Sequence, residues 1–278
     1  MSNEDIERYY QHAYDLVLSA GHIFREGSIG KKNVVTKTAF YDQVTEYDSR
    51  IEDMLFKGLA AKFPDHKFIG EETAAAEDKI PELTDAPTWI IDPIDGTTNF
   101  IKKIPHCCIS VGLAVNKELV VGIIYNPIAN ELFTARKGHG AYLNGERIHV
   151  SGVDQIKRAI IAYEISLIHA ATCRDKNVKR IYKLGSNATG TRSFGTAALS
   201  LCYVAMGRVD CYHVEDLKPW DMAAGVVIVR EAGGVAYHTY GGEFNVMKPD
   251  IIAGSTDSLC QDMVRLIREA DEIKYQFV

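Results

Sequence analysis

The sequence predicts a mixed α/β (α+β) fold in which helices are layered with sheets, and three patterns support this class. Apolar residues recur at helical spacing near the N-terminus, short β-type segments follow one another between residues 109 and 143, and strands alternate with helices after residue 159. No linker, repeat or low-complexity tract divides the chain. We therefore expect one domain that spans residues 1–278.

The first half of the chain is expected to begin with two helices and to continue as an antiparallel meander. Apolar residues from Ile6 to Phe24 have helical spacing, and Ser2 is suited to cap this helix. A second helical pattern runs from Ile51 to Phe63 and stops at the proline that follows. The expected strands of the meander are residues 109–115, 119–125, 132–135 and 141–143.

The second half is expected to alternate between strands and helices. The strands are expected at residues 159–163, 209–212 and 251–253. The helices are expected near residue 178 and over residues 196–206 and 221–232. Such alternation implies helices that pack on sheets.

The composition is typical of a globular protein with a sizeable core, because 46% of the 278 residues are hydrophobic and 24% are charged. A net charge of −6 gives no general attraction to nucleic acid or to an anionic membrane, so neither is expected as a partner. No signal peptide or membrane-spanning run is expected. The six cysteines lack metal-binding spacing and are expected to be reduced thiols, which suits a cytoplasmic location.

The strongest chemical signal in the chain lies at residues 89–100. The first three of these residues are expected to form a short buried strand, and a proline and Gly96 to bend the chain beyond it so that Asp92 and Asp95 converge. Mg²⁺ prefers carboxylate oxygens of this kind together with phosphate oxygens. The amides that follow Gly96 are expected to open a helix, and a helix N-terminus binds anions.

Two other segments place acids at the mouth of a secondary-structure element. Glu71 and Glu72 follow a small strand, and Asp221 follows Pro219 at the start of an apolar helix. Each segment alone has a structural alternative: a helix cap for Asp221, a solvated turn for the glutamates and a plain turn around Asp92. Their combination favours a site for metal and phosphate.

Three segments resemble the signature motifs of the inositol monophosphatase family of Mg²⁺-dependent, lithium-sensitive phosphatases: Gly70-Glu71-Glu72, residues 89–100 and Trp220-Asp221-Met222-Ala223-Ala224-Gly225. Further segments that match in the same order are residues 44–48, 136–145, 192–198 and 231–234. The resemblance implies the layered α-β-α-β-α sandwich of the sugar-phosphatase superfamily, and a homodimer. It also places Lys37 and Asp48 near the metal site, where they would pair and position a loop or else form a solvated surface pair.

The resemblance implies a set of metal ligands. Glu71, Asp92 and the backbone carbonyl of Ile94 would hold the Mg²⁺ that activates water. Asp92, Asp95 and Asp221 would hold a second ion that stabilises the leaving alkoxide.

The resemblance also assigns catalytic and substrate-binding roles. Glu71 with Thr97 would orient and deprotonate the attacking water, without a phosphoenzyme because no nucleophilic cysteine or serine motif is present. The phosphate would lie against the amides of Gly96 and Thr97. The segment Gly195-Thr196-Ala197 would open a helix and offer amides to substrate hydroxyls, although a plain turn before a helix is an alternative.

One position departs from the family pattern. Val214 stands where a sugar-contacting glutamate is expected, seven residues before Asp221. If the backbone is shifted by a residue or two, we expect Glu215, or else Asp216, to contact the substrate in its place, beside Asp95 and Asp221; otherwise a hydroxyl-binding contact is missing. The departure leaves the metal chemistry untouched and bears on the identity of the substrate.

The sequence therefore predicts a Mg²⁺-dependent phosphomonoesterase that hydrolyses myo-inositol monophosphates, small phosphorylated polyols, to myo-inositol and phosphate. A related phosphatase for another sugar phosphate or a phosphoadenosine nucleotide is an alternative. An inactive regulatory protein of the same fold is a third possibility. A binding protein has no need for the full set of site residues, which are Glu71, Asp92, Asp95, Thr97 and Asp221.

Overall fold

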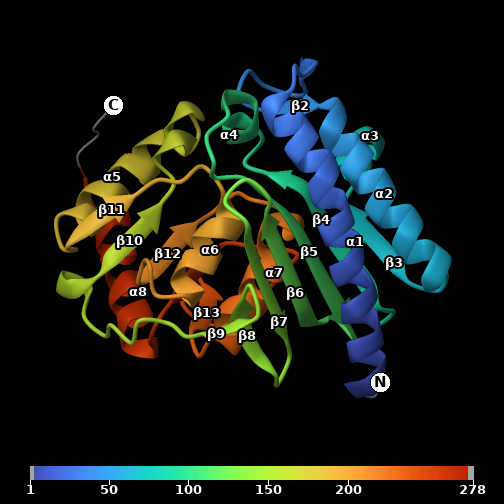
Figure 1. The fold of residues 1–278 in the computed structure, drawn as a ribbon. Coiled ribbons are helices and arrows are strands. Elements are labelled where there is room, and N and C mark those ends of the chain that lie inside the picture. Colours follow the sequence, from blue (N-terminus) through green and yellow to red (C-terminus); the bar gives the residue numbers. More distant parts are fainter. Residues whose placement is uncertain (1–2, 275–278) are drawn as a thin grey trace.

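The computed structural model describes residues 3–274 and shows five layers of secondary structure (Figure 1). Two sheets alternate with three pairs of helices, so the expected α-β-α-β-α arrangement is confirmed. In chain order the six layered helices are α1 (Asn3–Ile29), α2 (Glu46–Lys62), α5 (Arg174–Gly185), α6 (Ala197–Ala205), α7 (Pro219–Glu231) and α8 (Asp257–Asp271).

The larger sheet has seven strands, and the expected meander forms most of it. Its strands in spatial order are β3 (Lys67–Gly70), β4 (Thr88–Asp95), β5 (Cys108–Val115), β6 (Glu118–Asn126), β7 (Glu131–Arg136), β8 (Gly140–Leu143) and β9 (Glu146–Ile148). Only β3 and β4 pair in parallel, and the other neighbours are antiparallel. The strand β9 was not predicted, because three residues are too few to show a period of two.

The helices α1 and α2 cover one face of this sheet, where their apolar residues pack on side chains of β4, β5 and β6. The expected cap Ser2 lies outside the described residues. Helix α2 begins before its first apolar position, because Thr45 caps it: the Thr45 hydroxyl accepts from the amide of Tyr47 at 3.2 Å, and Asp48 accepts from the amide of Thr45 at 2.9 Å. A small hairpin of β1 (Val34–Thr36) and β2 (Gln43–Thr45) leads into this cap.

The helices α6 and α7 lie between the two sheets and are apolar on all sides. Glycines on the sheet allow α7 to lie directly against it. A Cβ atom on Gly122 of β6 would sit 2.3 Å from the carbonyl oxygen of Ala224, and one on Gly112 of β5 would sit 2.8 Å from the Cβ of Ala223. This close approach brings the first turn of α7 to the end of β4.

The smaller sheet has five strands and is covered on its outer face by α5 and α8, which share a third core cluster with it. Its strands in spatial order are β11 (Gly190–Arg192), β10 (Ile160–Tyr163), β12 (Cys211–Val214), β14 (Ile251–Gly254) and β13 (Val235–His238). The strand expected at residues 209–212 lies two residues further along the chain. The elements β11, β13 and α8 were not predicted.

Short helices complete the connections between the layers. They are α3 (Glu71–Glu77), α4 (Thr97–Lys102) and two 3₁₀ turns, η1 (Ile156–Arg158) and η2 (Ile165–His169). The six cysteines are free thiols, and all but Cys173 are buried. No helix within residues 3–274 is long and apolar enough to cross a membrane.

The contact between α7 and the larger sheet can be tested by adding one methyl group. Gly122→Ala should lower the free energy of unfolding by about 1–3 kcal/mol, because the new Cβ meets a backbone carbonyl that cannot rotate away. Gly185→Ala is the control, since a Cβ there meets only the Thr191 Cγ2 at 3.7 Å. Urea unfolding of both variants measures the difference, and equal stabilities would contradict the close packing.

Candidate functional site

Asp92 and Asp95 are both buried on β4, with exposed fractions of 2% and 7%. The strand does not end before them, as the sequence had indicated, but continues to Asp95. Between the two aspartates the register against β5 shifts by one residue, from Asp92 opposite Ser110 to Asp95 opposite Cys108. Residues three apart on a regular strand face opposite sides, so this bulge, and not a bend beyond the strand, turns both carboxylates to the same side.

Asp221 joins this pair from the first turn of α7. Carboxylate oxygens of Asp92, Asp95 and Asp221 all lie within 4.8 Å of one another. One oxygen of Asp221 also accepts from the amide of Lys218 at 2.6 Å. Asp221 is therefore a helix cap and a member of the acidic cluster, and the two alternatives from the sequence are compatible.

Asp92 and Asp95 are buried and Asp221 is partly exposed, and bringing three carboxylates to one point is electrostatically costly. Burial raises the pKa of Asp92, and the charges of Glu71, Asp95 and Asp221 raise it further. Burial likewise raises the pKa of Asp95 to about 6, although hydrogen bonds from Thr196, Ala198 and Ala197 oppose this shift. The pKa of Asp221 is raised by burial and by Asp95. A divalent cation would relieve this repulsion, and the oxygen-only donor set suits one.

Glu71 and Glu72 begin the helix α3, and they do not form a solvated turn. The ammonium group of Lys37 lies 2.9 Å from Glu71 and 2.8 Å from Glu72. Burial alone would lower the pKa of Lys37, yet these two carboxylates outweigh burial and raise it. Lys37 therefore holds Glu71 at the edge of the site as a fixed ion pair.

The expected pairing of Lys37 with Asp48 is wrong. Asp48 instead caps α2, where its Oδ2 accepts from the amide and hydroxyl of Thr45 at 2.9 and 2.6 Å. Burial raises the pKa of Asp48 to about 6, and its Oδ1 has no hydrogen-bond partner among the described residues. An acceptor-only atom that is buried in this way fits a neighbouring cation or a water bound to one.

Gly96 and Thr97 start the helix α4 directly after the bulged strand. Gly96 has φ of +86°, and a Cβ there would sit 2.9 Å from the carbonyl of His106. The Thr97 hydroxyl donates to the carbonyl of Ile94 at 3.0 Å. The Ile94 amide in turn donates to Asp92 at 2.9 Å, so these predicted site residues are linked to the cluster.

Gly195, Thr196 and Ala197 open α6, as the sequence indicates, and their polar groups are already engaged. The hydroxyl of Thr196 and the amides of Ala197 and Ala198 donate to Asp95, the amides at 3.3 and 2.7 Å. The N-terminus of α6 thus partly neutralises one member of the acidic cluster. The amide of Gly195 donates to Glu164 at 2.8 Å.

A cavity of about 150 Å³ adjoins the cluster. Its lining includes Asp95, Asp221, Glu164, Tyr212 and Val214. Glu164 and Tyr212 were not identified from the sequence. The available signal for Glu164 was its position directly after the predicted strand at residues 159–163, which is the same kind of position that Glu71 occupies.

Glu215 is placed away from this cavity, which corrects the expected substrate contact. On β12 the alternate residues Tyr212 and Val214 line the cavity, so the residues between and after them point to the other face. There Glu215 lies 2.6 Å from Lys176 and 2.8 Å from the fully buried Arg180. Burial would raise the pKa of Glu215, yet the two cations outweigh it and lower the pKa to about 2.

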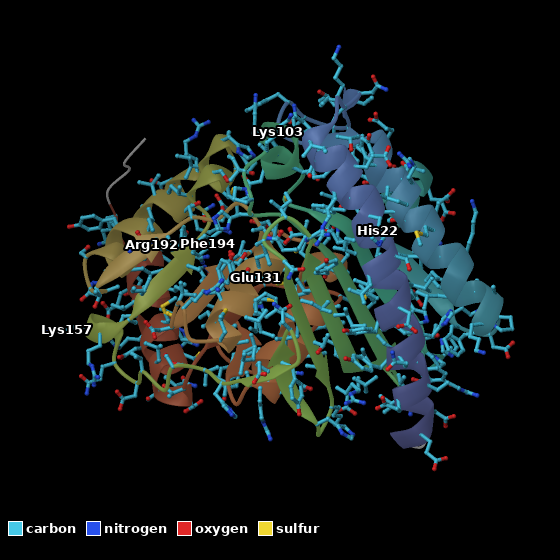
Figure 2. The ribbon with its side chains drawn as sticks, in the orientation of Figure 1. His22, Lys103, Glu131, Lys157, Arg192 and Phe194 are labelled. Carbon is cyan, nitrogen blue, oxygen red and sulfur yellow. The ribbon has the colours of Figure 1, made fainter. Side chains whose placement is uncertain are left out.

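Asp216 is no closer substitute. Its backbone adopts φ of +64°, its side chain is 64% exposed, and its carboxylate lies 3.5 Å from Lys176. Gly195 does line the cavity, and Arg192 and Phe194, labelled in Figure 2, lie on the segment that leads from β11 to it. Neither Glu215 nor Asp216 is among the described residues that line the cavity.

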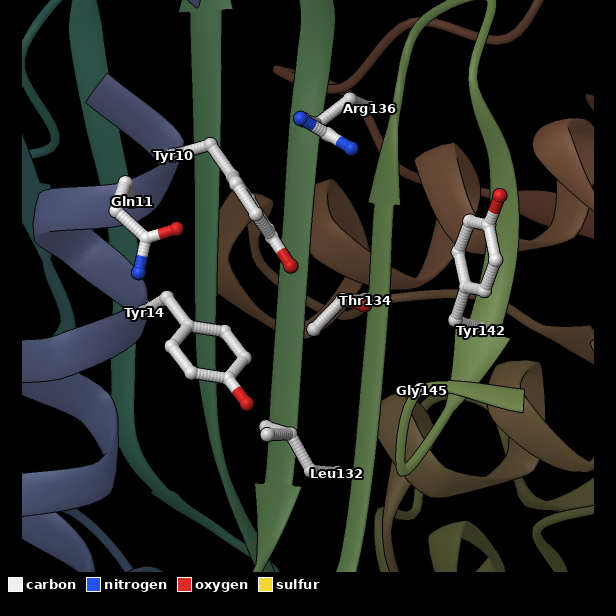
Figure 3. Close-up of a pocket in the computed structure, with 8 residues that line it drawn as sticks. All are labelled: Tyr10, Gln11, Tyr14, Leu132, Thr134, Arg136, Tyr142 and Gly145. Atoms are coloured by element: carbon white, nitrogen blue, oxygen red, sulfur yellow. The ribbon is translucent and has the colours of Figure 1, made fainter. Parts of the chain in front are cut away.

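A second cavity, of about 360 Å³, lies between α1 and the strands β7 and β8 (Figure 3). Tyr10 and Tyr14 of α1 face Thr134 and Tyr142 across it. Its lining, within the described part of the chain, contains no carboxylate. Within residues 3–274, the group of acids whose ligand atoms converge closely enough for a metal ion is the cluster around Asp92.

Two buried aspartates from a bulged strand and a partly exposed one from a helix, beside two helix N-termini in a layered α/β fold, are typical of metal-dependent phosphate ester hydrolases. The chain belongs to the inositol monophosphatase family, whose family model matches residues 5–272. It is accordingly a phosphomonoesterase of that family with an acidic metal-binding cluster.

Individual relatives agree with this assignment. The chain is 44% identical to inositol monophosphatase 3 of Solanum lycopersicum over 88% of its own length and 91% of the relative. It is 42% identical to inositol monophosphatase 2 of Homo sapiens over 95% and 90% of the two chains. Its structure is similar to that of an IMPase from Thermotoga maritima, with a TM-score of 0.80, 34% identity and coverage of 93% and 96%.

The role of Glu215 in an ion-pair network predicts a pH-dependent stability. Its pKa falls from 4.5 to about 2 on folding, so the ionised form stabilises the protein above pH 4.5 and this contribution is lost as the pH falls through 2. Glu215→Gln should lower the free energy of unfolding at pH 7 by about 3 kcal/mol, because Arg180 loses a buried partner. Chemical unfolding between pH 7 and pH 2 should show the two proteins converging.

The control is Glu118→Gln, which removes an ion pair with Lys137 whose side chains are more than half exposed. Exposed pairs contribute less than about 1 kcal/mol, so this variant should differ little from the unmodified protein at any pH. A Glu215→Gln deficit that stays constant down to pH 2 would contradict the ion-pair assignment.

Proposed function

We propose that this protein hydrolyses myo-inositol monophosphates to myo-inositol and phosphate and that it requires Mg²⁺. The observation that carries the proposal is the convergence of Asp92, Asp95 and Asp221 within 4.8 Å, beside a cavity that can admit a small leaving group. The relatives named as inositol monophosphatases support the choice of substrate.

The residues of the site fit the proposed metal. Glu71, Asp92 and the Ile94 carbonyl would hold one Mg²⁺, and Asp92, Asp95 and Asp221 would hold a second. Bound Mg²⁺ supplies a water of lowered pKa and neutralises the charge of the phosphate. Without such cations the buried carboxylates would repel a phosphate dianion.

The side chains around the cluster would position the water and the phosphate. Lys37 fixes the Glu71 carboxylate through its ion pair, and Thr97 is anchored by its bond to the Ile94 carbonyl. We propose that Glu71 accepts the proton of the attacking water while the Thr97 hydroxyl orients it. The amides of Gly96 and Thr97, at the start of α4, would receive the phosphate oxygens.

Direct attack by water is favoured over a covalent intermediate by the state of the nearby thiol. The Cys108 sulfur lies 3.9 Å from Asp95, and burial raises its pKa well above the ordinary value. A thiol that stays protonated is a poor nucleophile. We therefore propose in-line hydrolysis without a phosphoenzyme.

We further propose a homodimer that is inhibited by Li⁺ and that functions in the cytoplasm as a single domain. The first two properties rest on the family resemblance of the motifs. The free state of all six cysteines supports a reducing compartment.

The substrate and the metal can be tested together by phosphate release. Metal-free protein in EDTA should release no phosphate from myo-inositol 1-phosphate, and added Mg²⁺ should restore turnover. The same assay with a hexose phosphate and a phosphoadenosine nucleotide should give a lower kcat/KM. Full activity in EDTA would contradict the mechanism, whereas a preference for another ester would redirect only the substrate.

Asp221→Asn separates metal binding from capping. Asparagine can still accept from the Lys218 amide, and it removes one negative charge from the acidic cluster, so the Tm of the metal-free protein should not fall. The variant should lose Mg²⁺ affinity in calorimetric titration and at least about a hundredfold in kcat. Asp257→Asn, in the first turn of α8, is the matched control. A stability loss with full activity would show that Asp221 is only structural.

A further inference from the structure

Glu164 occupies a position in the site that the metal cluster does not explain. It follows β10 directly, caps η2, and lines the same cavity as Asp95 and Asp221. Among the described residues that line this cavity, it is the one carboxylate outside the acidic cluster. A carboxylate there is free to serve the leaving group rather than the metal.

The two oxygens of Glu164 differ in their remaining hydrogen-bonding capacity. Oε1 accepts from the amide of Ser166 at 3.0 Å, from the hydroxyl of Ser193 at 2.8 Å, and from the Ser166 hydroxyl. Oε2 accepts from the amide of Gly195 at 2.8 Å and has no second donor within residues 3–274. A carboxylate oxygen accepts about two hydrogen bonds, so Oε2 retains one acceptor position.

The surrounding contacts hold this acceptor in place. Gly195 has φ of +70°, and a Cβ there would sit 3.0 Å from the Nδ2 of Asn99. That amide group also donates to the carbonyls of His106 and Phe194 at 2.7 Å each. Glu164 is hydrogen-bonded both to Ser166 of η2 and to Gly195, whose own position is fixed by these contacts with Asn99. Oε2 is therefore preorganised to accept a hydrogen bond from a ligand.

The other two acids of the cavity, Asp95 and Asp221, belong to the acidic cluster that the proposed function assigns to the metal. Asp95 already accepts from Thr196 and from two amides of α6, and Asp221 accepts from Lys218. The wall formed by Val214 and Leu217 is apolar. A leaving group with several hydroxyls therefore finds at Glu164 the carboxylate of this cavity that lies outside the acidic cluster and keeps an open acceptor position.

We propose that Glu164 is a specificity-determining residue that accepts a hydrogen bond from a hydroxyl of the substrate's polyol group. The proposal rests on the proposed function, because the phosphate must be held at the acidic cluster for the leaving group to enter this cavity. It assigns to the end of β10 the recognition that the sequence had placed at Glu215.

The test compares an ester whose leaving group carries several hydroxyls with one that carries none. Glu164→Gln should raise KM for myo-inositol 1-phosphate about tenfold, as expected for one lost bond to a charged acceptor. The increase in KM for phenyl phosphate should be several-fold smaller. Glu164→Asp withdraws the acceptor oxygen but keeps the negative charge. It should raise KM for myo-inositol 1-phosphate relative to phenyl phosphate by the same ratio as Glu164→Gln. It replaces Glu164→Gln if that variant fails to fold.

Glu231→Gln is the matched control, because Glu231 accepts from the amides of Gly138 and Gly140 at 2.8 and 2.7 Å and lies outside the site. This variant should leave kcat and KM unchanged for both substrates. Equal losses for the two substrates in the Glu164 variants would show that Glu164 only positions the Gly195 segment, and would overturn the proposal. Unchanged kinetics for both would also overturn it.

Deoxyinositol phosphates that each lack one hydroxyl sharpen the experiment. The analogue that lacks the contacted hydroxyl should have, with the unmodified protein, a KM as high as that of Glu164→Gln for myo-inositol 1-phosphate. For that analogue, Glu164→Gln should raise KM no further. Additive effects for every analogue would contradict the contact. If the unmodified protein hydrolyses another polyol phosphate instead, the proposed substrate fails, and the same comparison on that ester still decides the role of Glu164.

Discussion

The bulge in β4 is the constraint on which the rest of the site depends. It turns Asp92 and Asp95 to the same side of a fully buried strand, where a regular strand would separate them. The cost is a concentration of negative charge in a region of low dielectric constant, which the raised pKa values of both residues reflect. The layers around this strand supply hydrogen-bond donors and a cation that offset this negative charge.

The layered fold meets this electrostatic demand in three places. The start of α6 donates three hydrogen bonds to Asp95, and the capping amide of Lys218 holds Asp221 at the start of α7. Lys37 pairs with Glu71 and Glu72 at the outer edge. None of these contacts neutralises Asp92, which keeps the centre of the cluster as the place where a divalent cation is most stabilising.

The wall of the leaving-group cavity follows from strand alternation as much as from residue type. Because Tyr212 and Val214 face the cavity, Glu215 necessarily faces α5, where Arg180 and Lys176 bind it. The free acceptor is supplied by Glu164 of a neighbouring strand instead. Substrate recognition and internal stability are thus divided between two glutamates at the ends of adjacent strands, β10 and β12.

Local patterns in the sequence were sufficient for a fold of helices layered with sheets, for most helices and the meander, and for the acids at the mouths of β3 and α7, whereas the α-β-α-β-α order followed from the family resemblance. The features predicted from local patterns depend on periodicity, capping and residue type, all of which act over a few neighbouring positions. Short strands such as β9 and β11 carry too few residues to show a period. The extension of β4 through Asp95, the partner of Lys37 and the direction of Glu215 were decided only by the tertiary structure. A bulge, an ion pair between distant segments and the face of a strand that meets a cavity all depend on what packs against them, and no local pattern records that.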